Sequence, residues 1–209
     1  MSRFSVPGSS APGSDEPILF AEETPWNPTL LLSTVVGLIV VAGLVVIGWR
    51  WTESRTADKT AAFLDAYTQT HDNVAKLGLL ENNASLPSVA GEALPLAATL
   101  LQTGEPVAAA KAYALAADHA KGALLGTALV GEAQALSEQG KVDEAIPLLR
   151  RVAAEKGAEG SRPLALLLKA RLLKVKGDIA GAKQALEELK AKYGDSAFAG
   201  EAEGLLKKL

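Results

Sequence analysis

The sequence contains no cysteine and only two histidines among its 209 residues. Without cysteine the chain has no disulfide, no thiolate nucleophile and no cysteine-ligated zinc or iron–sulfur centre. His71 and His119 each lack a His, Asp or Glu partner three or four positions away, so we expect both to be surface helix residues rather than ligands. The sequence therefore predicts no metal site and no cofactor.

The motifs that most often support catalysis are also missing. No G-x-x-x-x-G-K-[ST], G-x-G-x-x-G, G-x-S-x-G or H-E-x-x-H pattern occurs. Neighbouring acids such as Glu187 and Glu188 stand beside Lys190 and Lys192, which is typical of the solvated face of a helix. The chain has no polybasic segment for nucleic acid. We therefore expect no enzyme, no small-molecule substrate and no nucleic-acid partner.

One long apolar run stands out, residues 29–51, with the sequence TLLLSTVVGLIVVAGLVVIGWRW. An uncharged helix from Thr29 to Trp49 would be about 31 Å long, close to the hydrocarbon thickness of a bilayer. A removable signal peptide would have basic residues before the apolar run and small residues after it, whereas this run is preceded by acidic residues and ends in Trp-Arg-Trp. The run predicts a retained transmembrane helix, with Ser33 and Gly37 as a small pair that packs against a second membrane helix.

The segments on either side of this run differ in composition. Residues 1–28 form an acidic tail rich in Pro, Gly and Ser, which predicts a flexible tether. Residues 52–88 predict a helical linker followed by a loop at Asn82 to Ser88.

Residues 89–209 contain an internal repeat marked by glycine. Gly104, Gly140 and Gly177 are 36 and 37 positions apart, and each is followed five residues later by alanine. Small residues recur seven before each glycine and leucines recur four before it. The alanines five after the glycines are Ala109, Ala145 and Ala182. The small residues seven before are Ala97, Ala133 and Ala170, and the leucines four before are Leu100, Leu136 and Leu173.

The repeat predicts a helix, a tight turn at glycine and an antiparallel second helix. Pairs of this kind bury their apolar faces by stacking on one another. We therefore expect an all-α protein, with the N-terminal transmembrane helix followed by an α-solenoid of helix pairs over residues 89–209. The final segment, DSAFAGEAEGLLKKL, predicts a C-terminal capping helix that begins near Asp195 or Ser196.

The Gly-x-x-x-x-Ala core and the small residue seven before glycine resemble a tetratricopeptide repeat, over about Leu94 to Leu189. This resemblance implies a protein-interaction domain with a concave groove formed by the first helix of each pair. Projecting the groove positions of that repeat onto this chain gives a set of candidate partner-binding residues. They are Val130, Gln134, Ser137, Glu138, Leu167, Arg171 and Lys174.

The order of span, helical linker and divergent repeats, with IGWRWTESR at the exit, is similar to the ancillary subunit of the Sec translocon, the YfgM-like family. That resemblance implies a single-pass protein of the bacterial inner membrane, with a periplasmic repeat domain that binds translocon components or exported clients in a chaperone-like or scaffolding role. The basic residues Arg50, Arg55 and Lys59 after the span instead favour a cytoplasmic repeat domain. An alternative function is that of a structural accessory subunit or an assembly factor of a respiratory or photosynthetic complex.

Overall fold

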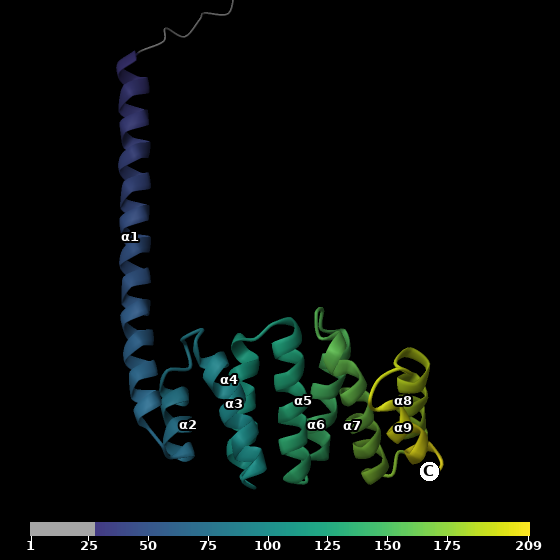
Figure 1. The fold of residues 1–209 in the computed structure, drawn as a ribbon. Helices are drawn as coiled ribbons and strands as arrows, with labels where there is room; N and C mark the ends of the chain where they lie inside the picture. The colour runs from purple at the N-terminus through teal and green to yellow at the C-terminus, as the bar shows by residue number, and fades with distance from the viewer. Residues whose placement is uncertain (1–27) are drawn as a thin grey trace, which may run out of the picture. The chain divides into compact units, whose positions relative to one another are not determined.

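A computed structural model of the chain describes the backbone of residues 28–209 and the side chains of residues 41–46 and 55–209. The chain divides into two units, Met1–Trp51 and Thr52–Leu209. The described part is helical, with no strand (Figure 1). Its helices are α1 (Pro28–Gln69), α2 (Asn73–Asn82), α3 (Val89–Gln102), α4 (Pro106–His119), α5 (Gly122–Glu138), α6 (Val142–Ala154), α7 (Arg162–Val175), α8 (Ile179–Lys192) and α9 (Ala199–Leu206), with a 3₁₀ turn η1 (Glu159–Ser161) before α7.

The prediction of a membrane span over residues 29–51, and with it the single-pass inner-membrane location, is overturned. Within the described residues, no helix has both the length and the apolar character needed to cross a membrane. The described side chains of the run are residues 41–46. The placements of the repeat domain in the periplasm or in the cytoplasm were both argued from that span, and neither is retained.

Two further predictions lie outside the described residues. Nearly all of the acidic tail, residues 1–27, is in the part of the chain that the structure leaves out, and the side chains of Ser33 and Gly37 are left out as well.

In the unit Thr52–Leu209 the three predicted helix pairs are present as α3 and α4, α5 and α6, and α7 and α8 (Figure 1). The glycine that joins each pair has a positive φ: 82° at Gly104, 76° at Gly140 and 86° at Gly177. This left-handed conformation is accessible to glycine without the Cβ penalty that other residues incur. The repeat glycines therefore mark the turns, as the sequence predicted.

The same hydrogen bonds close all three turns. At the second, the amide of Lys141 donates to the carbonyl of Leu136 at 2.9 Å and the amide of Gly140 donates to that of Ser137 at 2.9 Å. This pair of bonds is the Schellman motif, which satisfies carbonyls left free at a helix end. The equivalent pairs at the other turns are Glu105 to Leu100 with Gly104 to Leu101, and Asp178 to Leu173 with Gly177 to Lys174.

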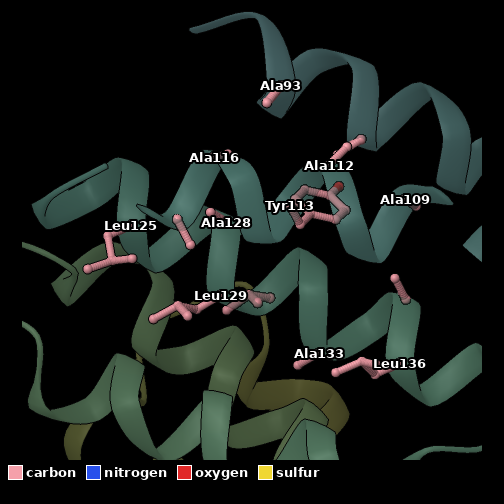
Figure 2. Close-up of a cluster of buried hydrophobic side chains, with 14 of the residues drawn as sticks. Ala93, Ala109, Ala112, Tyr113, Ala116, Leu125, Ala128, Leu129, Ala133 and Leu136 are labelled. Atoms are coloured by element: carbon pink, nitrogen blue, oxygen red, sulfur yellow. The ribbon is translucent and has the colours of Figure 1, made fainter. Parts of the chain in front are cut away.

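The repeated small and large residues form the core of the unit. The alanines five after and seven before each turn glycine are all buried, as are the leucines four before it. Figure 2 shows how these positions meet where α3, α4 and α5 pack together, with alanines on facing helices and larger side chains between them. Small residues at the contacts let the helices approach closely, so the solenoid core follows directly from the repeat.

The segment predicted as a linker also contributes to this core. Phe63 and Tyr67, from the last turns of α1, are 3% and 7% exposed, and Leu77 and Leu80 of α2 are buried beside them. The hydroxyl of Tyr67 donates to the carbonyl of Glu92 on α3 at 3.2 Å. The end of α1 and the whole of α2 therefore pack on the first repeat pair.

The helix boundaries at the end of the chain differ from the prediction. α9 begins at Ala199, with Phe198 rather than Asp195 or Ser196 at its N-cap position. The amide of Ser196 donates to the carbonyl of Tyr193 at 3.0 Å, so Ser196 belongs to the turn that leaves α8. Ala202 of α9 is fully buried against Leu186 and Leu189 of α8, so α9 packs on the last pair.

Candidate protein-binding surface

A cavity of about 270 Å³ lies between the first helices of the first two repeat pairs. Its wall combines apolar, amide and carboxylate groups from three helices. The lining residues are Ala98, Leu101 and Gln102 of α3, Tyr113 of α4, and Gln134 and Glu138 of α5.

Tyr113 lies between the two first helices because α5 has no side chain at Gly131. A Cβ placed on Gly131 would come within 2.3 Å of the ring of Tyr113. The tyrosine is 7% exposed, and burial raises the pKa of its phenol above the ordinary value. The phenol is neutral at physiological pH and forms part of the cavity wall.

Two of the predicted groove residues line this cavity. Gln134 and Glu138 are one turn apart on α5 and exposed, and the amide nitrogen Nε2 of Gln134 donates to Oε1 of Glu138 at 3.5 Å. Ser137, on the same stretch of α5, is half-buried, and its carbonyl accepts the turn hydrogen bond from Gly140. The carboxylate of Glu138 is the charged group among the lining residues.

The other predicted groove residues lie elsewhere. Val130 and Leu167 are 5% and 1% exposed and belong to the core, so a partner would not reach their side chains. Arg171 forms an ion pair with Glu201 of α9. The Nζ of Lys174 donates to the carbonyl of Lys208 at 3.2 Å. On the third pair, this surface is therefore in contact with the C-terminal segment.

The cavity residues of α3 were not among those predicted, although the repeat register contains the signal for them. Counting back six from the turn glycine gives Ala98 in the first pair, Gln134 in the second and Arg171 in the third. Counting back two gives Gln102 and Glu138. The groove positions of the second and third pairs therefore have counterparts in the first pair, and these line the cavity.

Tyr113 carries no such signal. It occupies the interior position nine residues after the turn glycine, where the other two pairs have leucine. It reaches the cavity because of the space left at Gly131 on the next pair.

In the described part of the chain, no group of three His, Asp or Glu residues is placed to hold a metal ion. His119 has a structural contact: its Nε2 hydrogen bonds to the carbonyl of Ala84, and so ties the end of α4 to the loop before α3. Glu187 and Glu188 pair with Lys183 and Lys192 on the surface of α8. What the surface offers is a set of contacts for another molecule.

A family model described as tetratricopeptide repeat matches residues 136–202. The match runs from the end of α5 into α9, so the chain contains tetratricopeptide repeats. The cavity between α3 and α5 lies almost entirely before the matched residues. No curated protein and no solved structure matches the chain.

Proposed function

We propose that the unit Thr52–Leu209 is a non-catalytic protein-binding module that holds a segment of a partner protein against α3 and α5. Tetratricopeptide repeats generally mediate protein–protein interaction, and the chain contains such repeats. The observation that carries the proposal is the cavity between the two first helices. It lies on the side of the pairs where the predicted residues Gln134 and Glu138 are exposed.

The size of the cavity favours a peptide over a free small molecule. Sites for drug-sized ligands usually have volumes of about 300 to 1,000 Å³ and enclose most of the ligand. A cavity of about 270 Å³ that is open to the surface instead accommodates one large side chain of a longer segment. An apolar side chain would contact Leu101 and Tyr113, while the amides of Gln102 and Gln134 meet the peptide backbone.

The finer partner hypotheses come from the resemblance to the ancillary translocon subunit. It supports a translocon component or an exported client as the partner, in a chaperone-like or scaffolding role. The alternative is a subunit of a large respiratory or photosynthetic assembly. The two hypotheses differ in the partner, so the identity of the bound segment distinguishes them.

The test is site-specific photocrosslinking in the full chain. A photoreactive amino acid replaces Gln134 in one sample and the exposed Lys183 of α8 in a control sample. We expect a discrete adduct at position 134 and not at position 183, with one partner segment identified by mass spectrometry. Competition by a synthetic peptide of that segment should abolish the adduct. Equal labelling at both positions, or an adduct that the peptide does not compete away, would contradict the proposal.

A further inference from the structure

A second cavity, of about 180 Å³, lies between α6, α7 and α8 and shares no lining residue with the first. Its floor is apolar and its rim is charged. The floor consists of Leu149, Ala153, Ala165 and Leu166, and the rim of Arg150, Arg162, Lys169 and Glu188.

Two of the cations on the rim have no counter-charge. Among the described residues, neither Arg150, which is exposed, nor Lys169, which is half-buried, has a hydrogen-bond or ion-pair partner. Cations in such surroundings are normally paired or fully solvated. Their charge therefore remains available to an anion that enters the cavity.

Arg162 is held in place and still has a free donor. Its Nη2 donates to the carbonyl of Glu155 at 2.9 Å and lies 3.2 Å from Oε1 of Glu159. Its Nε is buried and without a hydrogen-bond partner. An unsatisfied buried donor of a charged group costs free energy that a bound acceptor would recover.

Glu188, the acidic residue on the rim, forms an ion pair with Lys192. Oε1 of Glu188 accepts from Nζ of Lys192 at 2.8 Å, and this hydrogen bond, with the charge of Glu188, raises the pKa of Lys192. The nearby positive charge of Arg162 opposes that rise in the pKa of Lys192. The carboxylate of Glu188 is thus already neutralised, which leaves an excess of positive charge around the cavity.

We propose that this cavity binds a glutamate or aspartate side chain from an acidic segment of a partner protein. The guanidinium groups of Arg150 and Arg162 match the planar carboxylate, and Lys169 adds a point charge. The apolar floor accepts the methylene groups that carry the carboxylate. A phosphate group would gain less than a carboxylate side chain from contact with the apolar floor, so the lining favours a carboxylate.

This site is separate from the proposed binding surface on α3 and α5. Its lining comes from α6, α7 and α8, and none of the predicted groove residues is part of it. The two proposals can therefore be tested independently: evidence against one binding site would leave the other unaffected.

The test uses the full chain and a fluorescein-labelled peptide of Gly-Glu-Leu-Glu repeats, with binding followed by fluorescence anisotropy. The same peptide with Gln in place of Glu reports the contribution of charge. We expect the double variant Arg150→Gln and Lys169→Gln to weaken binding of the Glu peptide by about tenfold or more. We expect the Gln peptide to bind weakly to the original chain and to the variant alike.

A matched control removes the same charge elsewhere. Lys183→Gln with Lys207→Gln deletes two exposed cations that pair with Glu187 and Glu203 on their own helices. Its affinity for the Glu peptide should stay within about twofold of that of the original chain. An equal loss in this control would show that only the overall charge matters and would overturn the site.

Two further measurements complete the test. Reversing both unpaired cations, with Arg150→Glu and Lys169→Glu together, should reverse the preference, so that a Gly-Lys-Leu-Lys peptide binds more tightly than the Glu peptide; circular dichroism verifies that each variant is folded. A phosphoserine version of the peptide is compared with the Glu version on the original chain. Tighter binding of the phosphoserine peptide, or no reversal with a folded double variant Arg150→Glu and Lys169→Glu, would overturn the assignment to a carboxylate.

Discussion

The contact between Tyr113 and Gly131 shows how neighbouring repeat pairs adjust to each other at single positions. The residue nine after the turn glycine of the first pair is Tyr113, and the residue nine before the next turn glycine is Gly131. One pair later, the equivalent residues are Leu149 and Leu168. The tyrosine and glycine of the first contact are thus replaced by two leucines, which are intermediate in size, at the equivalent positions of the next contact. Such compensation in side-chain volume fits the close packing of protein interiors.

We predict that Gly131→Ala destabilises the fold by about 1 to 3 kcal/mol, because the added methyl group would overlap the buried ring of Tyr113. Urea unfolding measures the effect. Gly91→Ala is the control, since a Cβ at Gly91, in α3, meets nothing within 4 Å. That control should be neutral or stabilising by up to about 1 kcal/mol.

A double-mutant cycle tests the cause. In a Tyr113→Leu background, which reproduces the leucine of the other pairs, the ring is absent and Gly131→Ala should cost less. The same cost in both backgrounds would show that the loss does not arise from the contact between these two residues.

Glu132, beside Gly131 on α5, gives the fold a dependence on pH. Burial raises the pKa of its carboxyl above the ordinary value; Arg151 partly lowers this pKa and Asp118 raises it further. The folded chain therefore keeps the proton to a higher pH than the unfolded chain does. Stability contributed by this group is complete below the unfolded pKa of about 4.3 and is lost as pH rises through the folded pKa.

We predict that Glu132→Gln stabilises the protein more at about pH 7 than at about pH 4, because the amide stays neutral at both values. The measurement is the urea unfolding free energy of both chains at each pH. Asp118→Asn, which removes the repelling charge, should reduce the difference between the two pH values. A gain from Glu132→Gln that is larger at about pH 4 would contradict this account.

At the scale of the helix pair, the turn glycines carry the backbone conformation that joins the two helices. We predict that Gly140→Ala costs about 1 to 2 kcal/mol, since a residue with a Cβ is strained at a φ of 76°. Gly160→Ala in η1 is the comparison, because Gly160 is outside the set of positive-φ glycines and a Cβ there meets nothing within 4 Å. Differential scanning calorimetry of both variants would show the prediction wrong if their midpoints fell equally.

The helix pairs were predictable because their signal is periodic and local. Glycine at the turn, alanine at the close contacts and leucine between them each follow from one physical requirement, and the structure places all of them as expected. The start of α9 was missed because Ser196 and Asp195 are good caps in isolation, whereas the packing of Ala202 sets where the helix docks.

The candidate sites were only partly predictable, because cavities depend on contacts between different pairs. Gln134 and Glu138 follow from the repeat register, but Val130 and Leu167, from the same projection, are buried. The cluster of Arg150, Arg162 and Lys169 has no sequence motif. Its residues come together only when α6, α7 and α8 are packed.

At the scale of the whole unit Thr52–Leu209, the buried side chains separate into two clusters. The larger one extends from the end of α1 into α8, and the smaller one joins α7, α8 and α9 around Leu167, Leu186 and Ala202. In stacked repeats each pair contacts only its neighbours, so local stability varies along the chain. The terminal cluster should therefore open without the rest.

We predict that Ala202→Asp releases α9 by placing an unpaired charge in a fully buried position, at a cost of about 2 to 4 kcal/mol to the last pair. Native-state hydrogen exchange should become about a hundredfold faster in α8 and α9 and change by less than about threefold in α3 and α4. Glu203→Gln, at the exposed neighbouring position, is the control and should leave both regions unchanged. Equal acceleration in α3 and α4 would mean that the solenoid opens as one cooperative unit, since the loss of the terminal cluster would then have unfolded pairs that do not contact α9.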